Sequence, residues 1–349
     1  MKQIQVACCF DDAMAIPASV VAASTAAATT DAHVTFHMLH APSLSIDMAG
    51  LKAALDSDRF CLVSCAITDD LSTFYSTKQY SQAMYYRYLL PRLLDADRVI
   101  YLDSDTMVRK SLLELHDTDL MGRPIAAARD YGMTFHMRDH GIPIKYRGRY
   151  VSVDEYCRQA LDLDISTTPY FNSGVLVMDL DEWRRTNLAD RLMDYCRDNP
   201  GLTMADQDAG NHILRGDFAE LDTRWNSFTY LYREYLPLPG QKKTLIFGGY
   251  EKRIRPPSGE WLNILNKWMY EPWIVHFAYR SKPWEAHHRR TPYDDEYWAH
   301  AAHTPYLQQL RERYEVSKKQ TLAEMLAQRF ALPGVRSAVR RVQYLLRGR

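Results

Sequence analysis

One short apolar run that ends in two aspartates constrains this 349-residue chain more than any other stretch. Val99 to Leu102 are suited to a buried strand, and Asp103 and Asp105 follow at its carboxyl end. In extended backbone, residues i and i+2 point the same way, so we expect both carboxylates to aim at one point. A divalent cation such as Mg²⁺ or Mn²⁺ commonly compensates such paired charges. The alternative is a polar loop whose aspartates cap the next helix.

Composition and charge indicate an ordinary folded protein. Hydrophobic residues make up 46% of the chain, and 43 basic side chains balance 43 acidic ones, so overall charge gives no case for a nucleic-acid partner. The six cysteines form no CxxC pair, and no secretory signal is evident, which favours a reducing, cytoplasmic location. No run of eighteen apolar residues exists, and we therefore expect no transmembrane helix.

Strand and helix patterns alternate along the first hundred residues. The expected elements are strands at 3–10, 33–40 and 60–67, and helices from about residue 16, at 46–56 and at 82–94. Such alternation predicts an α/β fold with a mostly parallel central sheet flanked by helices on both faces. Ligands of these sheets bind beyond the carboxyl ends of the strands. Asp11, Asp12, Asp103 and Asp105 all occupy such ends, where a nucleotide would sit.

The later part of the chain contains further polar motifs at the ends of expected elements. They are Arg129-Asp130 after a short strand, Tyr170-Phe171-Asn172-Ser173-Gly174-Val175 entering a strand, Asp206-Gln207-Asp208 opening a helix, and His276 ending a strand before Lys282-Pro283-Trp284. Residues 131–168 and 229–270 look like insertions in which we identify no motif.

Taken in order, these blocks resemble glycosyltransferase family 8, which includes bacterial lipopolysaccharide galactosyl- and glucosyltransferases and glycogenin. The similarity covers roughly residues 3–284. It implies a GT-A (Rossmann-like) fold, a UDP-hexose donor, Mn²⁺ (or Mg²⁺), and transfer of glucose or galactose with retention of anomeric configuration. The implied acceptor is a glycan or glycolipid, such as lipopolysaccharide or another cell-surface glycan, and we expect acceptor choice to reside in residues 131–168 and 229–270.

The resemblance also implies roles for individual residues. The implied metal ligands are Asp103, Asp105 and His276; the implied donor-binding residues are Asp11, Asp12, Arg87, Asn172 and Lys282; the implied catalytic residues around the donor sugar are Gln207, Asp206 and Asp130. Of the last group, Gln207 matches the residue near the anomeric carbon. Taken singly, Asp206 could instead be a helix N-cap and Arg87 a solvated helix charge.

Two positions depart from the family pattern. Ala13-Met14 stand where an Asn-Tyr pair is usual, so a methionine replaces the ring that stacks on uracil. Tyr279-Arg280 stand where a glycine near the phosphates is frequent.

Two other functions stay open: a non-catalytic sugar-nucleotide-binding or scaffold protein, and a nucleotidyltransferase. The latter needs a Gly-rich phosphate loop, and residues 11–18 contain no glycine.

The C-terminal region is expected to be separate in character. We expect a glycosyltransferase domain over 1–285 and a helical region over 286–349. Residues 335–349 carry five arginines and no acid, with Val335, Val339, Val342 and Leu346 at helical spacing. A basic amphipathic helix is typical of segments that bind anionic membrane surfaces, which predicts a peripheral location on the inner membrane face. The alternative is a disordered basic tail.

Overall fold

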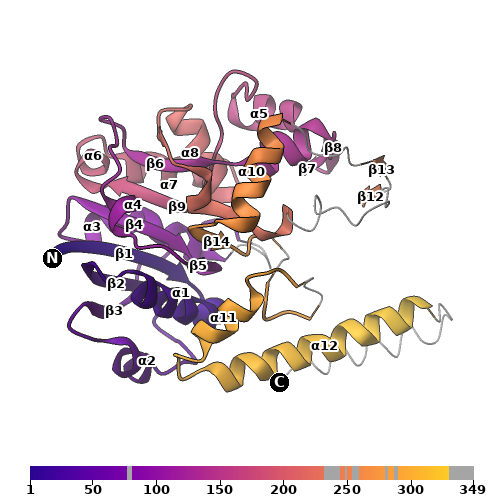
Figure 1. Ribbon diagram of the computed structural model, residues 1–349. Helices are drawn as coiled ribbons and strands as arrows, with labels where there is room; N and C mark the ends of the chain where they lie inside the picture. The colour runs from indigo at the N-terminus through magenta and orange to yellow at the C-terminus, as the bar shows by residue number, and fades with distance from the viewer. Residues whose placement is uncertain are drawn as a thin grey trace.

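A seven-stranded sheet forms the centre of the computed structural model (Figure 1), which describes residues 1–76, 81–231, 244–247, 250–253, 259–279, 282–286 and 290–329. The strands, in spatial order, are β10 (Ala219–Glu220), β6 (Ile125–Arg129), β9 (Phe171–Asp179), β4 (Arg98–Asp103), β1 (Lys2–Phe10), β2 (Ala32–His40) and β3 (Phe60–Ala66). Only β9 runs antiparallel to its neighbours in this sheet. The predicted mostly parallel sheet is therefore confirmed.

Helices cover both faces of the sheet because alternate side chains of its central strands enter two separate cores. In β1, Val6 and Cys8 pack with α1 (Ala15–Ala28) and α2 (Met48–Leu55), whereas Ala7 and Cys9 face the opposite core. That second core is closed by η2 (Gln82–Leu89), α6 (Leu180–Arg185), α7 (Leu188–Asp198) and α8 (Ala205–Leu214). Burial on both faces explains why residues 6–10 of β1 and 99–102 of β4 are continuously apolar.

The helix expected over 82–94 differs in kind from the prediction. Its first part, η2, is a 3₁₀ helix, and only α3 (Leu90–Leu93) is α-helical. Pro91 has no backbone N–H, so it cannot donate to the Arg87 carbonyl as an α-helix would require. That carbonyl accepts from the Leu90 N–H instead, which retains the tighter 3₁₀ geometry.

A second, three-stranded sheet brings late residues to the end of β4. It consists of β5 (Thr106–Val108), β14 (Ile274–His276) and β11 (Ser227–Phe228), with β14 in the middle. In β14, His276 pairs with Thr106 on one side and with Phe228 on the other. The short helix η4 (Thr223–Asn226) contacts β14, and helix α10 (Gly259–Tyr270) packs on η4 and shares a core with Phe228 and Val275 of this sheet.

The remaining elements lie around these two sheets. They are η1 (Asp12–Met14), α4 (Leu113–His116), η3 (Gly132–Arg138), β7 (Ile144–Tyr146), β8 (Arg149–Val151), α5 (Val153–Leu161), β12 (Thr244–Phe247) and β13 (Tyr250–Arg253). The insertion 131–168 thus contains η3 and a small hairpin in addition to the helix expected near 153–162. Most of the insertion 229–270 before α10 lies outside the described residues.

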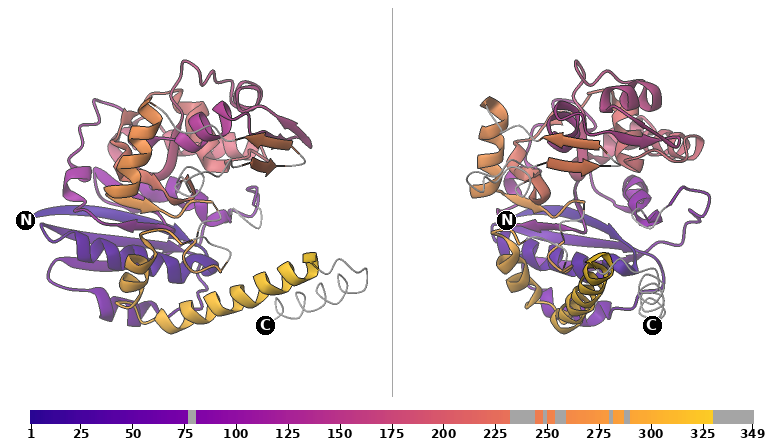
Figure 2. Two further views of the ribbon diagram at one scale, coloured as in Figure 1. Left: turned by 45° about the vertical axis from the view of Figure 1, so that its right-hand side comes forward. Right: turned by 90° about the vertical axis from the view of Figure 1, so that its right-hand side faces the viewer.

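Two helices end the described chain. The first, α11 (Asp294–Ala301), packs on α1, and Tyr297 and Ala301 share a core with Val20. The second, α12 (Leu307–Arg329), extends along one side of the molecule and past its body (Figure 2). The predicted basic helix over 335–349 lies outside the described residues. Among the helices that the structure describes, none has the length and apolarity needed to cross a bilayer.

Candidate functional site

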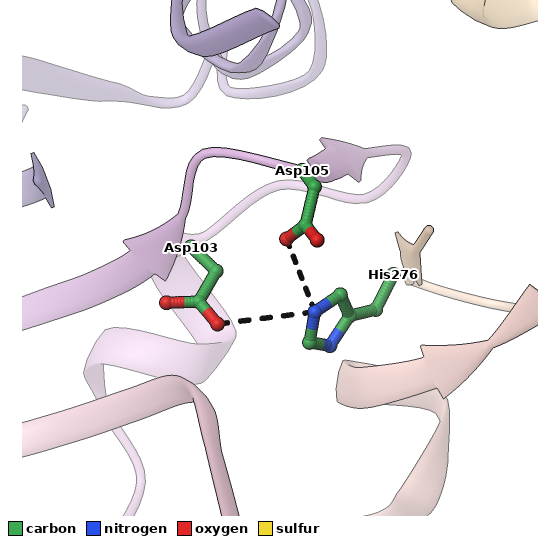
Figure 3. A group of neighbouring side chains, drawn as sticks. All are labelled: Asp103, Asp105 and His276. Atoms are coloured by element: carbon green, nitrogen blue, oxygen red, sulfur yellow. Dashed lines mark ion pairs between the residues drawn. The ribbon is translucent and has the colours of Figure 1, made fainter. Parts of the chain in front are cut away.

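Asp103, Asp105 and His276 converge at the carboxyl edge of the central sheet, where β4 meets the second sheet (Figure 3). One ligand atom from each residue lies within 4.8 Å of the other two. The imidazole Nε2 is 3.1 Å from Asp105 Oδ1 and 3.9 Å from Asp103 Oδ2. Two carboxylates and one imidazole that face a common point form a donor set suited to Mn²⁺.

A turn, rather than strand alternation, brings the two aspartates together. Strand β4 ends at Asp103, and Ser104 and Asp105 form a turn before β5. The Thr106 hydroxyl donates to the Asp103 carbonyl at 2.8 Å, which closes this turn. The prediction that extended backbone aims both carboxylates at one point is therefore wrong in its geometry, although the carboxylates do converge.

A glycine on β9 makes room for this arrangement. A Cβ at Gly174 would overlap His276 Cε1 and would lie 2.9 Å from Asp103 Oδ2. Any larger residue would therefore displace either the imidazole or the carboxylate. Glycine within a strand often marks such a close approach, and this was the available sequence signal for Gly174.

Arg87 is buried and joins two carboxylates. Its guanidinium lies 3.0 Å from Asp103 Oδ1 and 3.1 Å from Asp206 Oδ2, and it also donates to the Ser173 carbonyl at 2.8 Å. The guanidinium stacks over the Tyr101 ring, with its Cζ 4.1 Å from the ring centroid. Only 4% of Arg87 is exposed, which excludes the solvated-charge alternative.

Asp206 is also buried, and it does not cap a helix. Helix α8 begins at Ala205 with Met204 at its N-cap, whereas the Asp206 carboxylate faces Arg87. The alternative of an ordinary N-cap is therefore wrong. Burial raises the pKa of Asp206 above its ordinary value, even though the Arg87 charge opposes this shift.

Asp130, Asn172 and Gln207 form a second polar cluster. Asp130 Oδ2 accepts from Asn172 Nδ2 at 3.1 Å and from Gln207 Nε2 at 2.9 Å. Gln207 Oε1 in turn accepts from Asn172 Nδ2 at 2.8 Å and from the Ser173 backbone N–H at 3.1 Å. These contacts bring three of the residues predicted around the donor sugar into direct contact.

Lys282 adds a cation beside the aspartates. Its ammonium donates to the Asp105 carboxylate and, at 2.7 Å, to the Phe277 carbonyl. Burial alone would raise the pKa of Asp105, but Lys282 and His276 hold it well below its ordinary value. Asp105 is therefore a carboxylate at neutral pH.

Asp11 and Asp12 follow the end of β1, which pairs with β4 so that Cys9 lies opposite Asp103. Asp11 accepts from the Met14 backbone N–H at 3.0 Å and thereby caps η1. Asp12 is exposed and accepts from the Ser45 N–H at 2.6 Å, which ties η1 to the loop before α2. Both lie at the predicted edge of the sheet, and the contacts described for them are with backbone rather than with the metal-ligand candidates.

Three further residues at the site had no role predicted from the sequence. Asn226 contacts His276, Tyr101 donates to Asp103 Oδ1 at 2.7 Å, and Asp208 Oδ1 accepts from the Tyr170 hydroxyl at 2.7 Å. Burial raises the pKa of Asp208 to about 6, although the hydroxyls of Tyr156 and Tyr170 donate to its carboxylate. No local pattern singles out Asn226, because its partners His276 and Asn172 are distant in the sequence. Tyr101 belongs to the apolar run of β4, where it is indistinguishable from a core residue.

Comparisons with known proteins identify the family of this chain. The model of the family described as Glycosyl transferase family 8 matches residues 5–288. General stress protein A of Bacillus subtilis (strain 168) is 27% identical over 237 residues, covering 65% of this chain and 67% of that protein. Glycosyltransferase GlyA of Streptococcus pneumoniae serotype 4 (strain ATCC BAA-334 / TIGR4) is 23% identical over 253 residues, 72% of this chain but only 28% of that protein.

Solved structures share the fold. The galactosyltransferase LgtC, in complex with donor and acceptor sugar analogues, superposes with a TM-score of 0.65 at 22% identity, covering 89% of this chain and all of that one. The WbbM bifunctional glycosyltransferase gives a TM-score of 0.69 at 19% identity over 90% of this chain, which spans about half (52%) of WbbM. With the family match over most of its length, the chain belongs to glycosyl transferase family 8 and is a glycosyltransferase of the GT-A fold.

Proposed function

We propose that this protein transfers glucose or galactose from a UDP-sugar to a saccharide acceptor, with retention of anomeric configuration and with Mn²⁺ or Mg²⁺ as cofactor. The observation that carries the proposal is the convergence of Asp103, Asp105 and His276 beside the cluster of Asp130, Asn172 and Gln207. A cation site next to amide and carboxylate groups suits a substrate that has a diphosphate at one end and sugar hydroxyls at the other.

In this proposal different side chains bind different parts of the donor. A divalent cation held by the Asp103, Asp105 and His276 side chains would supply Lewis-acid stabilisation of the departing diphosphate. Lys282 would add a point charge to the same diphosphate. Asp130 and Asn172 would bind sugar hydroxyls, since a carboxylate accepts hydrogen bonds and an amide both accepts and donates them.

Gln207 is proposed to lie closest to the reacting carbon. The Ser173 backbone N–H donates to Gln207 Oε1, which fixes the direction of the amide before any donor binds. Asp206 belongs to the same helix, but it is buried against Arg87. We therefore assign Asp206 the role of holding Arg87 against Asp103, and Arg87 the role of stabilising the negative charge around the donor site.

Lipopolysaccharide or another cell-surface glycan is our proposed acceptor class, and a peripheral position on the inner membrane face is our proposed location. The support for the membrane part is the arginine-rich sequence of residues 335–349. Asp11 and Asp12 are proposed to meet the uridine end of the donor, because they lie at the edge of the sheet where β1 ends.

A thermal-shift screen tests the donor and the metal together. We expect UDP, UDP-glucose or UDP-galactose to raise the melting temperature when Mn²⁺ is present and to lose this effect in EDTA. A ligand at 100 times its Kd stabilises the folded state by about 2.7 kcal/mol, which corresponds to a shift of several degrees. GDP-mannose serves as the control nucleotide sugar. Equal stabilisation by UDP in EDTA would contradict a metal-bridged diphosphate.

The same samples separate an enzyme from a binding protein. Incubation with the preferred UDP-sugar, Mn²⁺ and a saccharide acceptor is expected to release UDP. Stabilisation by UDP-sugars without any UDP release across a panel of acceptors would favour the non-catalytic alternative.

A further inference from the structure

We propose that Asn226 is a positioning residue that fixes His276 as a metal ligand and connects it to the amide cluster around Gln207. The inference rests on the proposed metal-dependent function, and it concerns a residue that does not itself touch the metal or the donor. Asn226 is only 1% exposed and ends η4, directly before the strand β11 that pairs with β14.

The first step of the argument is the contact with the imidazole. Asn226 Oδ1 lies 2.8 Å from His276 Nδ1, on the side of the ring opposite to the aspartates. An amide oxygen can only accept a hydrogen bond, so Nδ1 carries the proton of this contact. Nε2, which faces Asp103 and Asp105, is then the nitrogen whose lone pair is available to a cation.

The second step is that the direction of the Asn226 amide is fixed by backbone groups. The Gly174 N–H donates to Asn172 Oδ1 at 2.9 Å, which identifies that atom as oxygen. The same oxygen lies 2.8 Å from the Asn226 amide, which must therefore present its NH₂ group to it and its oxygen to His276.

A second backbone group supports the same direction independently. The Ser173 N–H donates to Gln207 Oε1, so the Asn172 atom that contacts this oxygen must be its NH₂ nitrogen. The two backbone N–H groups therefore fix which atom of the Asn172 amide is oxygen and which is nitrogen. Asn172 in turn fixes the direction of the Asn226 amide, and Asn226 fixes which nitrogen of His276 carries the proton.

The third step is that the surroundings hold both partners in place. The Asp222 carboxylate accepts from the Arg224 backbone N–H and pairs with its guanidinium, which anchors η4. The Thr229 hydroxyl donates to the His276 carbonyl at 3.4 Å, and the Phe228 ring packs edge-on against the imidazole with centroids 5.6 Å apart. Groups supported in this way keep a ligand set pre-organised.

Two substitutions separate the two hydrogen bonds of Asn226. Asn226→Leu keeps a similar volume and removes both bonds. Asn226→Asp keeps an oxygen that accepts from His276 Nδ1, but it cannot donate to Asn172. Ser227→Ala is the matched control, because Ser227 is the next residue, is fully buried, and donates to the Arg224 carbonyl at 3.3 Å.

The readout is the affinity of the full-length protein for Mn²⁺, measured by electron paramagnetic resonance of the free ion, with melting temperature as a check on folding. We expect Asn226→Leu to weaken Mn²⁺ binding 10- to 100-fold, the usual effect of losing the partner of a ligating histidine. Asn226→Asp is expected to stay within about threefold of the wild type, as is Ser227→Ala, since each keeps an acceptor at His276 Nδ1. With a donor present, Asn226→Asp should still lower kcat because the link to Asn172 is lost.

The outcomes distinguish this inference from the proposed function. Folded Asn226→Leu that binds Mn²⁺ as tightly as the wild type overturns the inference alone. Should the leucine variant fail to fold, Asn226→Asp decides: wild-type-like Mn²⁺ affinity together with a lowered kcat supports the inference. A tenfold or greater loss of affinity, or a kcat equal to that of Ser227→Ala, overturns it. Wild-type protein that binds no Mn²⁺ overturns the proposed function, and the inference with it.

Discussion

Asp103→Ala is expected to lower donor turnover at least about a thousandfold in the presence of Mn²⁺. The substitution removes one of the three side chains that face the common point and leaves Arg87 with Asp206 as its only carboxylate partner among those described. Lewis-acid stabilisation of a departing diphosphate contributes several kcal/mol, and each 1.36 kcal/mol corresponds to a factor of ten in rate. UDP release from the preferred donor is the measurement.

The control for Asp103→Ala is an aspartate on the same molecule with a purely local role. Asp119 is exposed and accepts from the Met121 backbone N–H, so Asp119→Ala should leave turnover unchanged. Wild-type enzyme treated with EDTA should match the Asp103→Ala variant. Full turnover in EDTA would refute the assignment of a metal to these residues.

Arg87→Met is expected to lower the free energy of unfolding by about 3 to 5 kcal/mol at pH 7, because it leaves the Asp206 carboxylate buried without a counter-charge. Such a loss is a large part of the stability of a typical domain. Lysine at this position should recover only part of it, since an ammonium cannot reproduce the forked contacts to both carboxylates. Urea denaturation monitored by circular dichroism measures the difference.

The pH dependence gives this prediction a second readout. Burial already raises the pKa of Asp206 in the folded wild type, and removal of the Arg87 charge should raise it further. The folded variant then binds a proton that the unfolded chain releases, so its stability falls as pH rises. The deficit relative to the wild type should therefore shrink as pH falls from 7 to 5.

Two variants complete this test. Asp206→Asn in the Arg87→Met background should restore part of the lost stability, because it removes the unpaired charge. Arg185 also pairs with a carboxylate, but its side chain is 72% exposed, so Arg185→Met should show no measurable change. An Arg87→Met deficit that is independent of pH and unaffected by Asp206→Asn would contradict the buried charge network.

The order of elements in the first hundred residues could be predicted because periodicity and turn residues are local signals. Strand β1, helix α1 and strand β2 lie close to their expected ranges. Local signals also explain the failures. Residues 82–89 form a 3₁₀ helix, at whose end Pro91 removes the α-helical hydrogen bond to the Arg87 carbonyl, and a turn rather than a strand brings Asp105 toward Asp103. Neither changes the hydrophobic pattern from which the elements were inferred.

The candidate site was predictable as a set of motifs but not as a network. Resemblance to a family identified Asp103, Asp105 and His276 as candidate metal ligands, and the structure brings their side chains together. The resemblance did not identify Asn226, because its contact with His276 depends on the pairing of β11 with β14 across the intervening insertion. The burial of Arg87 could not be predicted either, because its three partners lie on β4, β9 and α8, which are distant from η2 in the sequence.

We propose above all that Asp103, Asp105 and His276 hold a cation that binds the diphosphate of a sugar nucleotide. Anomalous diffraction at the manganese absorption edge, from crystals grown with Mn²⁺ and UDP, tests it most directly. We predict one strong peak coordinated by Asp103, Asp105, His276 and oxygens of the UDP diphosphate. UDP bound with no metal at these three side chains, or a manganese peak held by other residues, would contradict the account.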